Sequence, residues 1–288
     1  MQQVSSFQNQ DTGTLYLVPT PIGNLDDMTF RAVKVLKDAD LIAAEDTRHT
    51  QQLLNHFDIH TPEISFHEHN TEQRIPELIE KLKGGVTIAQ CSDAGMPSIS
   101  DPGKELVAAA VREGIPVVPL PGANAGLTAL IASGLVPQPF YFYGFLERKH
   151  QQQVQELQQL RNRSETMIFY EAPHRLKKTL KTMAEVLGNK RQVVLARELT
   201  KRYEEFSRGC LAEINEFYMN HQPRGEYVII VAGNPHPDED GKQDETGTPI
   251  EQIDRAISEG LSTNMAIKLV AKKNKLNRQE LYKQYHNI

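Results

Sequence analysis

Several familiar signatures are missing from this chain of 288 residues, and each absence narrows its function. No apolar stretch approaches the roughly 20 residues that a membrane-spanning helix needs. Two cysteines, Cys91 and Cys210, are too few for a disulfide framework and favour a reducing compartment. The polar residues 1–13 lack a basic segment followed by an apolar run, so they predict a disordered leader rather than a secretory signal. We therefore expect a cytoplasmic protein with no membrane partner.

Nucleotide-binding and metal-binding signatures are absent as well. The chain has neither the GxxxxGK[ST] phosphate loop nor the GxGxxG dinucleotide fingerprint, which disfavours a site that grips phosphates with a glycine loop. Five of the ten histidines fall between His49 and His69, but HExxH spacing is missing, and we expect no metal. The net charge of −5 excludes a wholly basic nucleic-acid binder, although a local basic patch could still contact RNA.

What the chain does contain is a regular alternation of strand-like and helix-like segments. Short β-prone runs lie at 14–18, 41–44, 86–90 and 117–120, with helical spacing at 29–37, 50–56, 72–82 and 104–113. This alternation predicts a mainly parallel α/β sheet in a first domain, 14–134. The same kind of alternation continues through 151–161, 167–170, 175–186, 192–196 and 226–232. It predicts a second α/β domain, 135–233.

The composition changes after this second domain. Residues 234–249 hold three prolines, two glycines and five acids, which predicts a solvated linker. Residues 250–288 have helical periodicity in short pieces and carry seven Lys or Arg against four acids. The stretch 263–282 has the pattern of a helix-turn-helix, and small basic helical modules often contact nucleic acid. A terminal helical pair that only packs on the body is an equally good interpretation of the charge pattern.

Four loops follow predicted strands, at 19–24, 45–48, 91–103 and 121–126. In parallel α/β sheets, ligands bind outside the carboxyl ends of the strands. The third and fourth loops are rich in small residues and prolines, which let a backbone approach a ligand closely in a fixed shape. Ordinary strand-to-helix turns have a similar composition, so these loops alone do not identify a ligand.

Taken together and in order, the motifs resemble those of the tetrapyrrole methylase superfamily. The resemblance spans about 14–233 and rests on VPTPIGN at 18–24, EDTR at 45–48, SDAGMPSISDPG at 92–103, PGANA at 121–125, YEAPHR at 170–175 and RGE at 224–226. Within the superfamily the chain looks like the branch that methylates a cytidine ribose 2′-oxygen in bacterial 16S ribosomal RNA. Tetrapyrrole-acting members typically show Gly-Gly-Asp-Pro where this chain has Ala94-Gly95-Met96-Pro97, and the missing acid favours the RNA branch.

The resemblance implies two α/β domains with an S-adenosylmethionine cleft between them, a homodimer, and the small ribosomal subunit as partner. The helical periodicity of 250–288 adds a small C-terminal helical module to this fold. By position in the motifs, it implies cofactor contacts from Pro21, Ala94, Gly95, Met96, Ile99, Asn124 and Ala125. Weaker candidates from the second domain are Tyr170, Glu171, Leu199 and Gly225.

Methyl transfer to a ribose hydroxyl requires loss of a proton, which a nearby base would assist. We hypothesise that Glu45 or Asp46 orients or deprotonates the hydroxyl and that Arg48 holds a neighbouring phosphate. Glu171 and His174 are rival candidates. A salt-bridged helix cap is the structural alternative for 45–48. A methyltransferase for a small tetrapyrrole and a non-catalytic RNA-binding assembly factor also stay open as functions.

Overall fold

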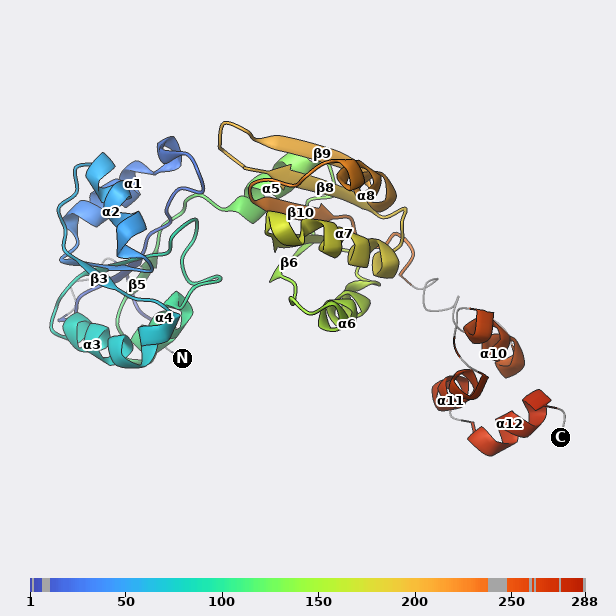
Figure 1. Cartoon of the computed structure of the whole chain (residues 1–288). Helices are drawn as coiled ribbons and strands as arrows, with labels where there is room; N and C mark the ends of the chain where they lie inside the picture. The colour runs from blue at the N-terminus through green and yellow to red at the C-terminus, as the bar shows by residue number, and fades with distance from the viewer. Residues whose placement is uncertain are drawn as a thin grey trace. The chain divides into compact units, whose positions relative to one another are not determined.

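The computed structural model describes residues 1, 3–6, 11–237, 248–258, 261, 263–274 and 276–286. The chain divides into two compact units, Met1–Gly233 and Asn234–Ile288 (Figure 1). No helix among the described residues is long and apolar enough to cross a membrane. Most of the predicted leader, 1–13, is described, but the acidic part of the predicted linker, 238–247, lies outside the described residues.

The first sheet of the larger unit has five strands in the order β3-β2-β4-β1-β5, and every pairing is parallel. Its elements are β1 (Leu15–Leu17), α1 (Phe30–Asp38), β2 (Leu41–Ala44), α2 (Thr47–His56), β3 (Glu63–Ser65), α3 (Thr71–Lys83), β4 (Ile88–Cys91), α4 (Gly103–Arg112) and β5 (Val117–Pro119). Leu36 of α1 and Leu54 of α2 bury one sheet face, while Leu78 of α3 and Leu106 of α4 bury the other. The predicted parallel α/β sheet is confirmed.

The second sheet also has five strands, in the order β6-β7-β10-β8-β9, but only β6 and β7 are parallel. Its strands are β6 (Phe140–Phe145), β7 (Thr166–Glu171), β8 (Gln192–Arg197), β9 (Glu205–Cys210) and β10 (Tyr227–Val231). Its helices are α5 (Ala125–Ser133), α6 (His150–Leu160), α7 (Pro173–Leu187) and α8 (Leu211–Asn220). The predicted two α/β sheets are therefore confirmed, with a mixed second sheet.

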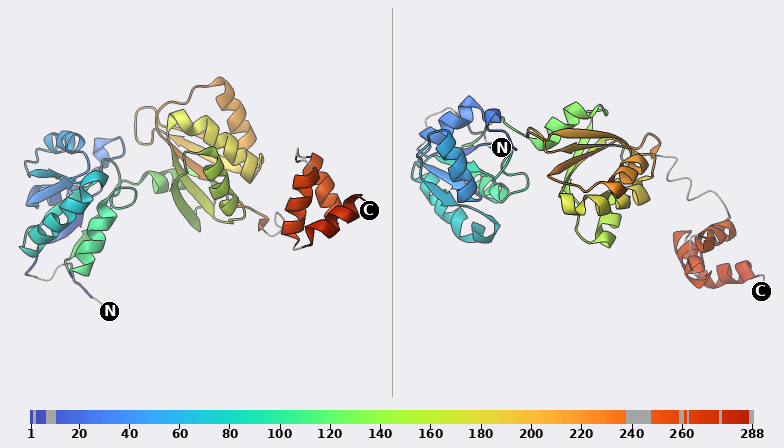
Figure 2. Two further views of the ribbon diagram at one scale, coloured as in Figure 1. Left: turned by 60° about the horizontal axis from the view of Figure 1, so that its bottom comes forward. Right: turned by 45° about the horizontal axis from the view of Figure 1, so that its top comes forward.

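Alternation along the strands explains how this second sheet is covered on both faces (Figure 2). In β7, Met167 and Phe169 pack against α6, α7 and α8, whereas Ile168 packs on the opposite face with Leu130 of α5. Successive strand side chains point to opposite faces, so a continuous apolar strand requires two helical layers. The periodicity did not predict α5, β6, β9 or α8 here, nor β3 in the first sheet. The two sheets lie on either side of the predicted boundary at 134/135, which stays a prediction.

The smaller unit has a hydrophobic core of its own. Its helices are α10 (Pro249–Ser258), α11 (Thr263–Lys273) and α12 (Arg278–His286). Ile253, Ile267, Val270 and Leu281 are almost fully buried where these helices pack together. The helical periodicity predicted over 250–288 is thus matched by helices, and the α11–turn–α12 succession follows the predicted helix-turn-helix pattern.

Candidate functional site

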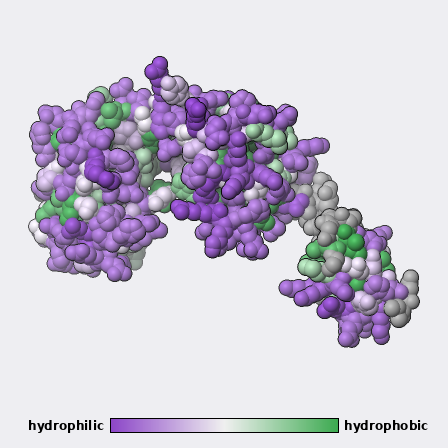
Figure 3. Space-filling view, viewed as in Figure 1, coloured by the Kyte–Doolittle hydropathy of each residue, from purple (hydrophilic) through white to green (hydrophobic). Residues whose placement is uncertain are grey.

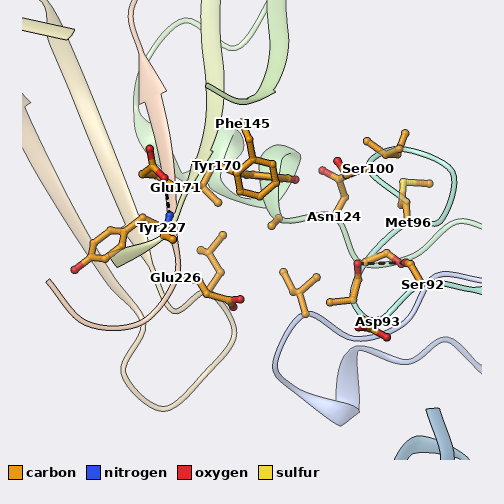
Figure 4. Close-up of a pocket in the computed structure, with 18 of the residues that line it drawn as sticks. Ser92, Asp93, Met96, Ser100, Asn124, Phe145, Tyr170, Glu171, Glu226 and Tyr227 are labelled. Carbon is orange, nitrogen blue, oxygen red and sulfur yellow. Dashed lines mark hydrogen bonds between the residues drawn. The ribbon is translucent and has the colours of Figure 1, made fainter. Parts of the chain in front are cut away.

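A pocket of about 510 Å³ lies within the larger unit, where loops after strands of both sheets contribute its walls (Figure 4). In the close-up, Ser92, Met96, Ser100 and Asn124 stand on one side, and Tyr170 stands with the second-sheet residues on the other. A volume of this size lies within the range of about 300–1,000 Å³ that is typical of small-molecule sites. Carboxyl ends of parallel strands form much of the rim, as the sequence predicted.

The first-sheet wall is built by two loops that are tied together. Thr20 and Gly95 exchange two backbone hydrogen bonds of 3.0 Å each, and the Thr20 hydroxyl donates to the Ser92 carbonyl at 3.1 Å. Gly95 has a φ of +77°, a conformation that glycine adopts without steric cost. These contacts join the loop after β1 to the loop after β4 and fix the edge of the pocket.

A buried carboxylate organises the rest of the loop after β4. Asp101 accepts hydrogen bonds from the amide of Ser98 at 2.6 Å, the amide of Gly103 at 2.8 Å and the side chain of Gln90 at 3.1 Å. Ser98 has a φ of +69°, which is costly for a residue with a side chain and is held here by the Asp101 contact. Asp101 therefore shapes the loop that presents Met96 and Ile99.

Glu45 is one of the two candidate bases that line the pocket, and Glu171 is the other. The Glu45 carboxylate accepts a 3.1 Å hydrogen bond from the amide of Asp93, whose own carboxylate accepts one of 3.0 Å from the amide of Asp46. Burial raises the pKa of Glu45, the hydrogen bond from Asp93 opposes this rise, and the charges of Asp93 and Asp101 add to it. The result is a half-buried carboxylate that is more basic than an ordinary glutamate.

Asp46 and Arg48 have a different role. Asp46 is the N-cap of α2: it accepts a 2.9 Å hydrogen bond from the amide of Arg48 and forms an ion pair with the Arg48 guanidinium. These bonds hold the pKa of Asp46 well below its usual range, so it is a poor base. Neither residue lines the pocket. The salt-bridged cap considered for 45–48 therefore describes Asp46 and Arg48, and Glu45 stands apart from it.

Two residues at the end of β7 form the opposite wall. The Tyr170 hydroxyl oxygen accepts a 3.0 Å hydrogen bond from the amide of Gly126 at the start of α5, and burial raises its pKa. The Glu171 side chain, only 1% exposed, accepts from the amide of Ala172 at 2.9 Å and the hydroxyl of Thr179 at 2.6 Å, and pairs with Arg175 at 3.2 Å. Every Glu171 oxygen is thus occupied, which disfavours it as a base.

A charged triad in the second-sheet wall was not predicted from the sequence. The Lys201 ammonium donates to Glu198 at 3.0 Å and to Glu226 at 2.9 Å. Glu198 and Thr200 have φ values of 49° and 65°, a strained conformation for residues with side chains. A positive φ at a residue other than glycine cannot be recognised from the neighbouring residue types, because it depends on the surrounding tertiary structure.

Most of the predicted cofactor residues line this one pocket. They are Ala94, Gly95, Met96, Ile99, Asn124, Ala125, Tyr170, Glu171 and Leu199. Pro21 and Gly225 do not line it, but their neighbours Ile22 and Glu226 do. His174 does not line this pocket but lines a second, adjoining cavity. Cys91 is the last residue of β4 and is fully buried, and burial raises the pKa of its thiol to about 12, so it is not a candidate nucleophile.

Phe145, Ala196, Tyr227 and Val228 line the pocket without having been predicted. They come from the ends of β6, β8 and β10, and only the order of strands in the second sheet brings these ends together. The one available signal was the apolar character of the runs themselves, which does not reveal which end faces a ligand. Among the described residues, no cluster of three His, Cys, Asp or Glu side chains could hold a metal ion.

Comparison with known proteins agrees with the predicted family. The family model described as Tetrapyrrole (Corrin/Porphyrin) Methylases matches residues 14–215. Proteins named ribosomal RNA small subunit methyltransferase I match over nearly their whole length. The one from Bacillus subtilis strain 168 is 52% identical over 99% of this chain and 98% of its own. The one from Streptococcus pyogenes serotype M18 is 53% identical over 100% of both chains.

Solved structures agree at the level of the fold. Diphthine synthase aligns with a TM-score of 0.61 at 14% identity, covering 77% of this chain and 90% of its own. Uroporphyrin-III C-methyltransferase from Thermus thermophilus, complexed with S-adenosylhomocysteine, aligns with a TM-score of 0.54 at 17% identity, covering 76% and 97%. The chain therefore belongs to the tetrapyrrole methylase family and is a methyltransferase, grouped with relatives that carry the name ribosomal RNA small subunit methyltransferase I.

Proposed function

We propose that this enzyme transfers the methyl group of S-adenosylmethionine to the ribose 2′-oxygen of a cytidine in 16S ribosomal RNA of the small subunit. The observation that carries the proposal is the 52–53% identity, over essentially whole chains, to relatives named for small-subunit ribosomal RNA. Met96, in place of the acid that tetrapyrrole-acting members typically carry, supports an RNA substrate. An enzyme with this substrate works where ribosomes are, in the cytoplasm.

The residues of the pocket fit S-adenosylmethionine. The small side chains and the loop backbone of the pocket allow a ligand to approach closely, and no glycine-rich phosphate-binding loop is present in its lining. S-adenosylmethionine has no phosphate and needs no such loop. Ala94, Gly95, Met96, Asn124 and Ala125 would hold the cofactor from the first-sheet side. Leu199 and Tyr170 would hold it from the other. When bound, the cofactor supplies an electrophilic methyl group on a sulfonium.

Glu45 acts as the base in this proposal. Its carboxylate lines the pocket, and its raised pKa keeps it a better proton acceptor than a solvated glutamate. The backbone amide of Asp93 positions the Glu45 carboxylate by donating the 3.1 Å hydrogen bond to it. The remaining rate enhancement comes from alignment of the ribose oxygen with the methyl group, because the methyl group is transferred by an in-line displacement.

The test measures labelled methyl transfer into purified small ribosomal subunits, naked 16S RNA and a tetrapyrrole. A 2′-O-methyl group blocks alkaline cleavage of the adjacent phosphodiester, so the product is recognised as an alkali-resistant dinucleotide containing cytidine. Transfer to the tetrapyrrole, or to a base instead of a ribose, would contradict the proposal. Cofactor binding without transfer to any of the three would favour a non-catalytic assembly factor.

A homodimer is part of the same proposal, with α5 in its interface. Leu127 and Ile131 lie one turn apart on the outer face of α5 and are 43% and 80% exposed. Val136 and Phe140 follow, 69% and 43% exposed. Exposed apolar side chains grouped in this way are typical of an interaction surface.

We expect Ile131→Glu to shift the protein from dimer to monomer, because a charge in an apolar interface loses its hydration. Light scattering coupled to gel filtration at micromolar concentration measures the mass. Val111→Glu on α4, at a side chain 47% exposed outside this surface, is the matched control and should stay dimeric. A monomeric wild-type protein, or an Ile131→Glu dimer, would contradict this interface.

The smaller unit is proposed to contact RNA through its basic surface. Lys268 and Lys272 are exposed one turn apart on α11, and Arg278 and Lys283 are exposed on α12. Each cation that neutralises an RNA phosphate releases condensed counterions, which makes binding depend on salt.

We expect Lys268→Gln/Lys272→Gln to weaken binding to small subunits by roughly 10-fold and to flatten its salt dependence. Filter binding over a series of salt concentrations measures both effects. Lys34→Gln/Lys37→Gln on α1 removes the same net charge from the other unit and serves as the control. Equal effects of the two double variants would show that only total charge matters and would remove the specific role of α11.

A further inference from the structure

A second cavity, of about 780 Å³, adjoins the first and is not explained by cofactor binding. The two cavities share Phe145, Glu171 and Ala172 in their linings. These residues are the last of β6, the last of β7 and the residue after it. Because β6 and β7 are parallel, their carboxyl ends meet at one edge of the sheet, and both cavities open from this edge.

The wall of the second cavity is a loop that a buried ion pair holds in place. Arg175 donates to the carbonyl of Leu146 at 2.7 Å and to that of Glu147 at 3.1 Å, while its Nε lies 3.2 Å from Glu171. The loop between β6 and α6 is thereby fixed against the start of α7. Arg148, the next residue of this loop, lines the cavity.

Positive charge exceeds negative charge in this lining. Glu171 is compensated by Arg175, which leaves Arg148 and Lys178 opposite the single carboxylate of Glu147. Arg148 and Lys178 are exposed, and their side chains make no hydrogen bond or ion pair with any part of the chain that the structure describes. His150, 3.7 Å from Glu185, and His174 also line the cavity. The surface over α6 and α7 is largely hydrophilic (Figure 3).

Unpaired cations that stand in one cavity are suited to a phosphate. A guanidinium offers a planar fork of donors and an ammonium a compact charge, and both bind phosphate oxygens. The same side chains would repel a second cation and gain little from an apolar ligand. A methyl acceptor in the first cavity that is part of an RNA strand must have backbone phosphates beside it, at the common edge.

We propose that the second cavity binds a backbone phosphate of the RNA strand next to the methylated nucleotide, through Arg148 and Lys178. Arg175 is a positioning residue that fixes the Arg148 loop. The inference rests on the proposed function, because it takes the strand in the first cavity to be RNA. Phe145, 55% exposed at the boundary of the two cavities, presents an aromatic ring between the reacting nucleotide and this phosphate.

The test compares the wild type with Arg148→Gln/Lys178→Gln. Steady-state methylation of small subunits at saturating S-adenosylmethionine should show a KM raised roughly 10-fold with kcat changed less than 2-fold. The slope of log affinity for 16S RNA against log salt should fall by about 0.7–1, the value for one lost phosphate contact. Lys177→Gln/Lys181→Gln removes the same charge from α7 outside the cavity lining and should leave both quantities unchanged.

An unchanged KM and salt slope in the cavity variant would overturn the inference, and so would an equal effect of the control variant. Inorganic phosphate as a competitor separates the two sources of the ligand: inhibition at low millimolar concentration that the cavity variant abolishes would assign the site to free phosphate instead. The RNA-binding measurement needs no methyl transfer. An inactive wild type would therefore overturn the proposed function while the phosphate site is still judged by binding.

Discussion

Replacement of Glu45 by Gln is expected to lower kcat for methylation of small subunits by about 100-fold, with little change in cofactor affinity. Glutamine keeps the shape and can still accept the hydrogen bond from Asp93, but it cannot accept a proton. The wild-type activity should rise with pH through the raised pKa of Glu45, because only the ionised carboxylate is a base. This acid limb should disappear in the variant.

The pH profile of kcat, measured together with equilibrium binding of S-adenosylhomocysteine, distinguishes a base from a structural residue. Asp46→Asn is the control on the neighbouring position: it weakens the cap of α2 but leaves the acid limb in place. Normal turnover by Glu45→Gln, with normal cofactor binding, would remove Glu45 from the role.

Replacement of Glu171 by Ala is expected to lower the free energy of unfolding by about 3–5 kcal/mol, because it leaves Arg175 without its buried partner. It also leaves the Thr179 hydroxyl and the Ala172 amide without their acceptor. In a unit of this size the loss corresponds to a melting temperature lower by roughly 10 °C. Thermal unfolding followed by circular dichroism measures it.

Glu185→Ala, on the same helix, is the matched control. Its carboxylate is 46% exposed and lies 4.0 Å from Lys181, so its removal should cost less than about 1 kcal/mol. Glu171→Gln, which disturbs the packing less, should keep the acid limb of the pH profile. A melting temperature for Glu171→Ala within 2 °C of the wild type, or loss of the acid limb in Glu171→Gln, would contradict a structural role.

The fold was predictable to the extent that local patterns encode it. Four strands of the first sheet follow from short apolar runs separated by amphipathic helices, and their parallel pairing follows from that alternation, whereas β3 was not predicted. The second sheet was only partly predictable. Its edge strands β6 and β9 and the helix α5 lack a clear period, since Phe140 and Ile131 remain exposed and blur the expected contrast between buried and solvent faces.

Several loops that line the candidate pocket were predictable for a similar reason. Small-residue loops after strands mark where a backbone can approach a ligand, and the order of motifs indicated the family. The ion pairs of Lys201 with Glu198 and Glu226 were missed, although Glu226 stands in the RGE motif, because they join residues up to 25 positions apart.

The sequence by itself determined the family, four of the five strands of the first sheet and the small-residue loops of the pocket, because these depend on patterns within short segments. Only the tertiary structure distinguishes the surroundings of the three candidate acids. Glu45 accepts a hydrogen bond from the amide of Asp93, 48 positions away in the sequence. Asp46 caps the N-terminus of α2, and the carboxylate of Glu171 is bound by Arg175 and Thr179. Proton affinity depends on burial and on charged neighbours, and folding alone brings those neighbours together.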